Sequence, residues 1–174
     1  SVLRKEQRKM DKHKNITLIG MPGAGKSTIG VLLAKAVGGA FIDTDLLLQQ
    51  KHCKLLQQIV DELGFQGFIE EEGNTICTVS PEHAVIATGG SAIYYEPAMK
   101  HLEEISEIIY LRLSLDEIDS RINNRATRGI ALKEGQTLAS LYEDRVPLYE
   151  KYAHRIVDCD GKNPEQVLQE ILQG

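Results

Sequence analysis

The residues whose types and spacing could do chemistry most directly lie at positions 20–27, which read Gly-Met-Pro-Gly-Ala-Gly-Lys-Ser. This block fits the pattern G-x-x-x-x-G-K-[ST], whose glycines let the backbone curl so that successive N–H groups point at an anion. A helix that begins at Lys26 would add a favourable dipole. The block therefore predicts a nucleotide site in which Lys26 reaches the β- and γ-phosphates of ATP and the Ser27 hydroxyl binds Mg²⁺. The residues expected to contact the nucleotide here are Gly23, Ala24, Gly25, Lys26, Ser27 and Thr28.

Two other interpretations of this glycine-rich block are disfavoured. A turn with a chance lysine would not require the strand-like run 16–19 before the block and the helical pattern after it, yet both are present. A dinucleotide site would need the pattern G-x-G-x-x-G, and Thr28 occupies the place of its third glycine. A phosphate-binding loop for a nucleoside triphosphate is the better prediction.

Two carboxylates follow the next strand-like run, and they could serve the same site. The run 40–42 ends at Asp43, and Asp45 comes two residues later. A phosphate-binding loop needs an acid for its magnesium ion, normally at the end of a neighbouring strand, and Asp43 meets that requirement. If the strand continues, alternation places Asp43 and Asp45 on the same side, at the sheet edge where α/β proteins bind ligands. The alternative is that either acid only caps a helix beginning near Leu46.

The elements that must position these residues alternate between short apolar runs and longer segments of helical period, which predicts a parallel sheet with crossover helices. Helix ends are indicated by Gly38-Gly39 and Gly64, and helix starts by Asp116 and Asn163. The predicted strands are 16–19, 40–42, 84–87, 108–113 and 156–157. The predicted helices are 26–37, 55–63, 68–79, 96–104, 116–124, 137–153 and 164–172.

The segment 125–136 fits neither pattern. It has two glycines, three basic residues and mixed polarity, and a long loop inside a compact domain is usually functional. We expect it to be a lid over the nucleotide site.

Composition and charge exclude several classes of protein. The chain has 174 residues, of which 42% are hydrophobic, and this is typical of one soluble domain. The tail 1–14 is basic, whereas residues 16–174 carry 14 basic and 23 acidic side chains, which argues against nucleic-acid binding by the single domain expected over 15–174. No apolar stretch approaches the roughly 20 residues of a membrane span. Three cysteines without metal or redox spacing indicate reduced thiols in the cytoplasm. We also expect the protein to be a monomer.

Two other classes of nucleotide-binding protein lack support. A GTPase would need a guanine-reading N-K-x-D, which the sequence does not contain, and its two D-x-x-G matches, at Asp61 and Asp158, lie where no switch loop is expected. A motor or transporter ATPase would have a catalytic acid after the strand 85–88. That run ends instead in Gly89-Gly90-Ser91.

The order of these motifs resembles that of the shikimate kinases. The resemblance covers nearly all of 15–174 and rests on the phosphate-binding loop, Asp43-Thr44-Asp45, Gly89-Gly90 and the segment from Arg145 to Ala153. It implies an α/β, three-layer P-loop kinase fold, with a five-stranded parallel sheet of order 2-3-1-4-5, helices on both faces and a lid. It also implies transfer of the γ-phosphoryl group of ATP, with Mg²⁺, to a hydroxyl of shikimate or a related small hydroxylated acceptor.

The resemblance also implies roles for single residues. Asp43 matches the metal-associated acid, and Asp45 the acid that holds the acceptor's hydroxyls. The remaining matches are Gly89 and Gly90, whose backbone approaches the acceptor, Arg121 near the adenine, Arg128 of the lid on the phosphates, and Arg145 on the acceptor's carboxylate. From the residues alone, Arg121 could equally be a solvated helix residue, and Arg145 could be structural.

One departure from the family pattern limits how far the acceptor can be named. Where the family has a Phe-Arg pair whose arginine binds the acceptor carboxylate, this chain has Phe68-Ile69. The loss of such a clamp would weaken shikimate binding by about a hundredfold or more. No Lys or Arg lies between Lys54 and Lys100, so a replacement must come from the lid or from the region of Arg145. A kinase with a different acceptor and a nucleotide-binding regulatory module without kinase activity therefore remain alternatives.

Overall fold

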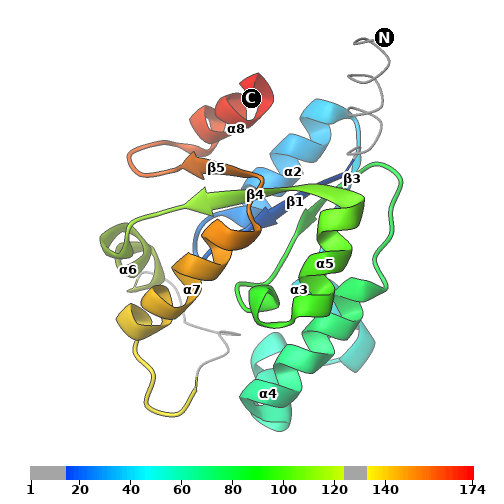
Figure 1. The fold of residues 1–174 in the computed structure, drawn as a ribbon, viewed down its shortest axis with the longest axis vertical. Coiled ribbons are helices and arrows are strands. Elements are labelled where there is room, and N and C mark those ends of the chain that lie inside the picture. Colours follow the sequence, from blue (N-terminus) through cyan, green and yellow to red (C-terminus); the bar gives the residue numbers. More distant parts are fainter. Residues whose placement is uncertain (1–14, 124–132) are drawn as a thin grey trace.

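A computed structural model describes residues 15–123 and 133–174, and its centre is a five-stranded sheet in which every pairing is parallel (Figure 1). The strand order is β2-β3-β1-β4-β5, which confirms the order that the family resemblance implied. The predicted tail 1–14 and most of the predicted lid, including Arg128, lie outside the described residues. The strands are β1 (Asn15–Ile19), β2 (Ala40–Asp43), β3 (Ala84–Ala87), β4 (Ser106–Arg112) and β5 (Arg155–Asp158).

Helices cover both faces of the sheet, which confirms the three-layer prediction. Figure 1 shows α2 and α8 on one face and α5 and α7 on the other. The central strands are buried on both sides, as parallel sheets require, and all four residues of β3 are buried. The helices are α2 (Lys26–Val37), α3 (Thr44–His52), α4 (Leu56–Cys77), α5 (Glu96–Ile105), α6 (Leu115–Asn123), α7 (Leu138–Tyr152) and α8 (Pro164–Gln173), with a 3₁₀ turn η1 (Ala92–Tyr94).

The structure corrects the sequence-based elements in two places near the predicted acids and glycines. The strand that ends at Asp43 does not continue through Asp45, because α3 begins at Thr44 and Asp43 caps it with its side chain. The two helices predicted on either side of Gly64 form one element, α4, with a kink at Gly64, whose φ of 69° is left-handed.

Two predicted helix starts have different outcomes. Asn163 caps α8, with its side chain accepting a hydrogen bond from the backbone of Gln166, as expected. Helix α6 begins one residue before Asp116, and the Ser114 hydroxyl accepts from the backbone of Glu117 at 3.3 Å instead. Asp116 therefore lies in the first turn, where its charge still favours the helix.

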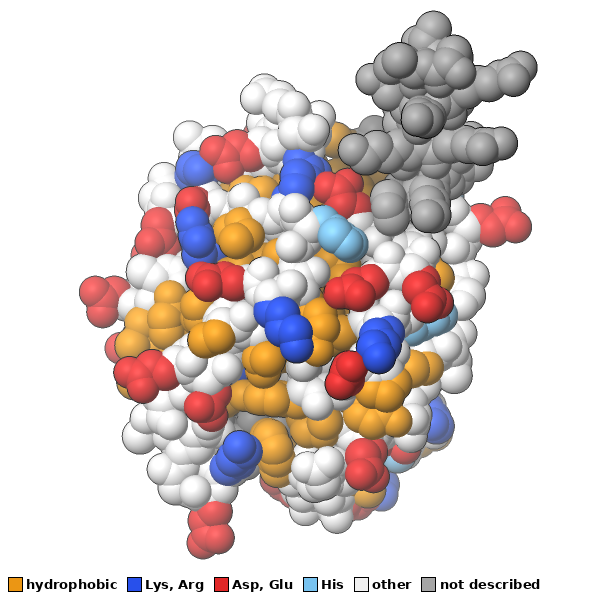
Figure 2. All heavy atoms as spheres, in the orientation of Figure 1, with side chains coloured by type: hydrophobic (Ala, Val, Ile, Leu, Met, Phe, Trp, Pro, Cys, Tyr) orange, Lys and Arg blue, Asp and Glu red, His pale blue; other side chains and the backbone are white. Residues whose placement is uncertain are grey.

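The surface carries both signs of charge. On the face drawn in Figure 2, acidic and basic side chains are interspersed and form no continuous basic patch. Within residues 15–123 and 133–174, no helix has the length and apolar content to cross a membrane.

Candidate active site

The phosphate-binding loop lies between β1 and α2 and has the backbone that its glycines were expected to allow. Gly23 and Gly25 have φ values of 83° and 90°, in the left-handed region that favours glycine. At Gly20 a Cβ would lie 2.8 Å from the carbonyl oxygen of Leu111 on β4, so the loop also passes close to the sheet. These three positions give the chain the curl that an anion-binding loop needs.

Lys26 lies inside this loop. Its Nζ donates hydrogen bonds to the carbonyl oxygens of Gly20, at 2.6 Å, and Met21, at 2.9 Å. Burial lowers the pKa of Lys26 to about 8, with Asp45 opposing the shift. An ammonium group held in this way is positioned for the phosphate chain of a nucleotide.

Ser27 and Asp43, the two predicted metal residues, are in direct contact. The Ser27 hydroxyl donates to Asp43 Oδ2 at 2.8 Å, while Asp43 Oδ1 accepts from the backbone N–H groups of Asp45, at 2.9 Å, and Leu46, at 3.4 Å. Asp43 is thus both a helix cap and the carboxylate beside Ser27, so the two interpretations of this residue are compatible.

The donor set of this pair fits magnesium. A hydroxyl and a carboxylate are oxygen ligands of the type that Mg²⁺ prefers, and it usually takes one or two of them together with substrate phosphates. Within the described part of the chain there is no cluster of three or more His, Cys, Asp or Glu side chains that could hold a metal ion by itself. Ser27 and Asp43 would therefore hold Mg²⁺ jointly with ATP.

Asp45 lies in the first turn of α3 and is largely buried. Its Oδ1 has no hydrogen-bond partner within residues 15–123 and 133–174. Burial and the neighbouring Asp43 raise the pKa of Asp45 to about 6, while Lys26 opposes the shift. A carboxylate with an unsatisfied buried oxygen is suited to accept a hydrogen bond from a ligand hydroxyl.

Glu72 of α4 is a second buried carboxyl group at this place, and it matches the glutamate that follows the arginine of the family's Phe-Arg pair. The Ser91 hydroxyl donates to its Oε1 at 2.7 Å. Burial and the charge of Asp45 raise the pKa of Glu72 to about 8, against the effects of Ser91 and Arg145. Glu72 is therefore neutral at pH 7, and the pairing with Ser91 across 19 residues leaves no local signal in the sequence.

Gly89 and Gly90 lie between these acids and a buried arginine. A Cβ on Gly89 would clash with Glu72 Oε2 and would lie 2.7 Å from Asp45 Oδ1. A Cβ on Gly90 would lie 2.7 Å from Arg145 Nη1 and 3.1 Å from Pro22 of the phosphate-binding loop. Only glycines fit at these two positions, so their backbone is open to close approach.

Arg145 comes from α7 and is 1% exposed. Its guanidinium lies over the Tyr94 ring, with Cζ 5.5 Å from the ring centroid. One turn further along α7, the Tyr149 hydroxyl donates to the carbonyl oxygen of Gly90 at 2.6 Å. The helix is thus attached to the glycine pair, and it brings Arg145 to the same place as Asp45 and the phosphate-binding loop.

Arg121 also lies at the nucleotide side. Its Nη1 donates to the carbonyl oxygen of Gly23 at 3.1 Å, and its Nε pairs with Glu117 at 3.2 Å. It is therefore in contact with the phosphate-binding loop. Arg128 lies outside the described residues, so its predicted place on the phosphates stays a prediction.

Ile69 occupies the position on α4 where the family pattern has an arginine, and its side chain is buried, with 2% exposed. Phe68 before it is also buried. Helix α4 therefore adds an apolar side chain at this position.

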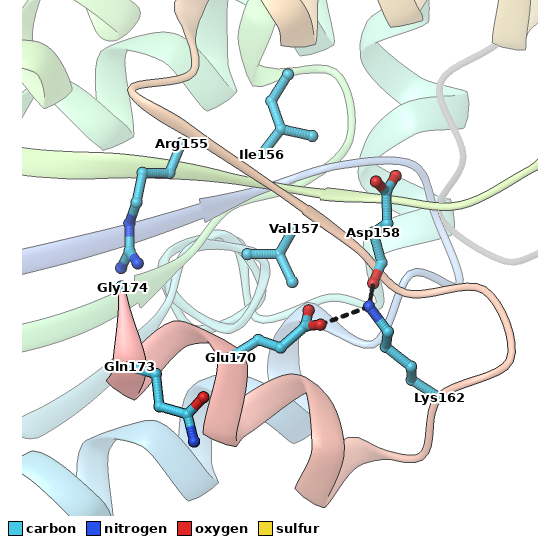
Figure 3. A pocket seen from close by; sticks show the side chains of 8 residues that line it. All are labelled: Arg155, Ile156, Val157, Asp158, Lys162, Glu170, Gln173 and Gly174. Atoms are coloured by element: carbon cyan, nitrogen blue, oxygen red, sulfur yellow. Dashed lines mark hydrogen bonds and ion pairs between the residues drawn. The ribbon is translucent and has the colours of Figure 1, made fainter.

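A separate hollow between β5 and α8, of about 470 Å³, includes none of the predicted site residues (Figure 3). The Lys162 side chain there donates to Glu170 at 2.6 Å and to the carbonyl oxygen of Asp158 at 2.8 Å. Arg155 pairs with Glu107 at 2.5 Å. Because its basic groups are already bonded within the chain, this hollow is not a second candidate.

The fold, together with the phosphate-binding loop and the charged residues at the carboxyl ends of the strands, defines a P-loop phosphotransferase that acts on a small molecule. Comparisons with known proteins agree. The family model described as shikimate kinase matches residues 22–174. The chain is 35% identical to the shikimate kinase of Corynebacterium jeikeium (strain K411), covering 89% of this chain and 84% of the relative. It is also 35% identical to shikimate kinase 2 of Serratia proteamaculans (strain 568), over 91% and 94% of the two chains.

Among solved structures, the shikimate kinase from Acinetobacter baumannii in complex with shikimate has a TM-score of 0.84 and 30% identity, covering 95% of this chain and 94% of that one. This chain belongs to the shikimate kinase family. It is a phosphotransferase with an alcohol group as acceptor, and it uses ATP and Mg²⁺.

Proposed function

We propose that the protein transfers the γ-phosphoryl group of ATP to a hydroxyl group of shikimate. The observation that carries the proposal is the convergence on Gly89-Gly90 of Asp45, Arg145 and the phosphate-binding loop, from three different elements. A small acceptor with a hydroxyl group and a carboxylate needs a hydrogen-bond acceptor, a cation and a nearby phosphate donor. This place supplies all three, and the relative from Acinetobacter baumannii is in complex with shikimate.

Lys26, Ser27 and Asp43 handle the nucleotide in this proposal. Phosphoryl transfer passes through a loose transition state, so positioning and charge neutralisation carry most of the catalysis. The Lys26 ammonium stabilises the charge that develops on the phosphate oxygens, and Ser27 and Asp43 hold Mg²⁺. Arg121, next to Gly23, borders the adenine, and Arg128 is assigned to the phosphates on the family pattern alone.

Asp45 handles the acceptor hydroxyl. Its unsatisfied Oδ1 accepts the hydrogen bond of the hydroxyl and receives its proton as the oxygen attacks the γ-phosphorus. The bond between that phosphorus and the β,γ-bridging oxygen breaks, and ADP leaves. The backbone of Gly89 and Gly90 lies along the acceptor, and Arg145 binds its carboxylate through charge-assisted hydrogen bonds.

The test is Asp45→Asn, which keeps the size of the side chain and removes the base. We expect kcat with shikimate to fall about 10²- to 10⁴-fold with little change in the KM for ATP, measured by ADP release and by mass spectrometry of the product. Asp61→Asn is the matched control, because Asp61 is exposed on α4 and accepts a hydrogen bond from the Gln57 side chain at 2.8 Å, outside the predicted site.

Three other results would change the proposal. Full activity in the Asp45→Asn variant would remove Asp45 from the mechanism. Turnover of another hydroxy acid, sugar or hydroxylated amino acid without turnover of shikimate would replace the acceptor. If neither shikimate nor any of these other compounds causes ADP release, the result would favour a nucleotide-binding regulatory module without kinase activity.

We also infer one kinase domain over 15–174, acting as a monomer in the cytoplasm and without nucleic acid. All three cysteines are free thiols, of which Cys159 is buried, and this is compatible with a reducing compartment. The excess of acidic side chains after residue 15 disfavours phosphate backbones as partners. Light scattering during size-exclusion chromatography would test the monomer.

A further inference from the structure

The acceptor site has an apolar side where a second cation would be useful. An acceptor carboxylate beside Gly90 meets Arg145, but α4 offers buried Ile69, and the chain has no Lys or Arg between Lys54 and Lys100. A second cation for that carboxylate must therefore come from another element.

Two aromatic rings connect Arg145 to such a cation. Tyr94, whose ring lies under the Arg145 guanidinium, packs edge-to-face against Phe65 with 5.7 Å between the ring centroids. Lys133 places its Nζ 5.4 Å from the centroid of Phe65. The pair of rings therefore carries a cation at each end, Arg145 from α7 and Lys133 from the segment that precedes α7.

Two properties of this array, which consists of Arg145, Tyr94, Phe65 and Lys133, point to an anionic ligand. None of the ion pairs within residues 15–123 and 133–174 includes Lys133. The hydroxyl oxygen of Tyr94 is buried and has no hydrogen-bond partner in the same part of the chain. A buried hydroxyl without a partner costs free energy, which a carboxylate oxygen of a ligand would recover.

The array also lies along the side of α4 that faces the acceptor site. Phe65, Ile69 and Glu72 follow one another at spacings of four and three residues, so they share one face of the helix. Glu72, at one end of this face, reaches Gly89 and Ser91. Position 65 precedes position 69 by about 6 Å along the axis, a distance that the flexible four-carbon stem of a lysine can span.

We propose that Lys133 is a specificity-determining residue, whose ammonium group, together with Arg145 and the Tyr94 hydroxyl, binds the carboxylate of the acceptor on the side where α4 supplies Ile69. This rests on the proposed function, because it needs an acceptor that carries a carboxylate. A lysine offers a point charge and lacks the planar fork of an arginine, so its contribution is less dependent on geometry and more sensitive to salt.

The test compares Lys133→Met, which keeps the apolar stem, with Lys151→Met. Lys151 is a matched control, since its Nζ also lies over an aromatic ring, that of Tyr152, at 5.0 Å, and it is not part of the site. We expect Lys133→Met to raise the KM for shikimate about tenfold and to leave kcat and the KM for ATP nearly unchanged. Lys133→Arg should retain most of the affinity, and Tyr94→Phe should raise the KM several-fold.

A second substrate separates binding of the carboxylate from a merely structural effect. With the methyl ester of shikimate, which has no negative charge, the Lys133→Met variant and the unsubstituted protein should have equal KM values. An equal loss for the acid and the ester would overturn the role of Lys133, as would a Lys133→Met variant that behaves like Lys151→Met with shikimate. Both of these results leave the proposed function standing, whereas a protein that does not phosphorylate shikimate at all refutes both.

Discussion

The buried carboxyl group of Glu72 makes the stability of the protein depend on pH in a direction that can be measured. Its pKa is about 8 in the folded protein against 4.5 for an ordinary glutamate, so between these values the folded state binds the proton that the unfolded state has lost. A raised folded-state pKa contributes stability that is fully present below 4.5 and is lost as the pH rises toward 8. Replacement by glutamine keeps an acceptor for the Ser91 hydroxyl and removes the titration.

The magnitude follows from the width of this window. Each pH unit inside it is worth about 1.4 kcal/mol at most, so a rise from pH 5.5 to 7.5 costs the unsubstituted protein roughly 2 kcal/mol relative to Glu72→Gln. For a domain of this size, that corresponds to about 4 to 8 °C in Tm. The titration of Asp45 near pH 6 changes the stability of both proteins by the same amount, because the side chain at position 72 is neutral in both at that pH. It therefore drops out of the Tm difference between them.

The assay is thermal unfolding of both proteins at pH 5.5, 6.5 and 7.5. The Tm of the Glu72→Gln variant should rise relative to the unsubstituted protein at each step. Asp158→Asn is the control, because hydrogen bonds from Arg112 at 2.6 and 3.0 Å lower the pKa of Asp158, and a lowered pKa changes stability only in acid. Its Tm difference should stay constant across this range. A constant difference for Glu72→Gln as well, or one that grows toward low pH, would refute the assignment of a neutral buried acid.

Two further substitutions test the glycine pair and the nucleotide side. Gly89→Ala should abolish most acceptor turnover and lower the Tm, since its Cβ would clash with the carboxylates of Asp45 and Glu72 at a cost of about 1–3 kcal/mol. Kinetics and thermal unfolding measure the two effects. Gly67→Ala is the control on α4, because its Cβ would meet only the Leu63 side chain, at 3.2 Å, and it should leave acceptor turnover unchanged. Arg121→Met should raise the KM for ATP several-fold and leave the KM for the acceptor unchanged, because the Arg121 guanidinium contacts the phosphate-binding loop at Gly23. An unchanged KM for ATP would show that Arg121 has no part in nucleotide binding.

Most of the fold could be predicted from the sequence, because the strands of a parallel sheet are buried on both faces and appear as short continuous apolar runs. The residues of β3 illustrate this, since all four are apolar and buried, and their predicted bounds are confirmed. Helix α3 was predicted only as the alternative, beginning near Leu46, because Thr44 and Asp45 also fit the continuation of a strand. What decides the matter is a local hydrogen bond, from the backbone of Asp45 to the side chain of Asp43, which polarity alone does not reveal.

The candidate site likewise has a part that could be predicted from the sequence and a part that could not. The phosphate-binding loop and Asp43 were found because their chemistry lies in a short local pattern at the end of a strand. The array of Tyr94, Phe65 and Lys133 could not be found, because its members come from three separate segments and meet only through tertiary packing. Lys133 in particular belongs to the segment predicted as a lid, where its basic character was noted but its neighbour on α4 could not be known.

The departure from the family pattern at Ile69 and the Ser91 hydroxyl that follows the glycine pair both bear on the charge of Glu72. An arginine at position 69 would stand one turn from Glu72 on the same helix and would favour its ionised form. With isoleucine there, the acid is buried without a cation on its own helix, and burial keeps it protonated. The Ser91 hydroxyl gives Glu72 Oε1 a hydrogen-bond donor, which lowers the cost of burying this carboxyl group. Of the two carboxyl groups beside Gly89, those of Asp45 and Glu72, only that of Asp45 is therefore ionised at pH 7.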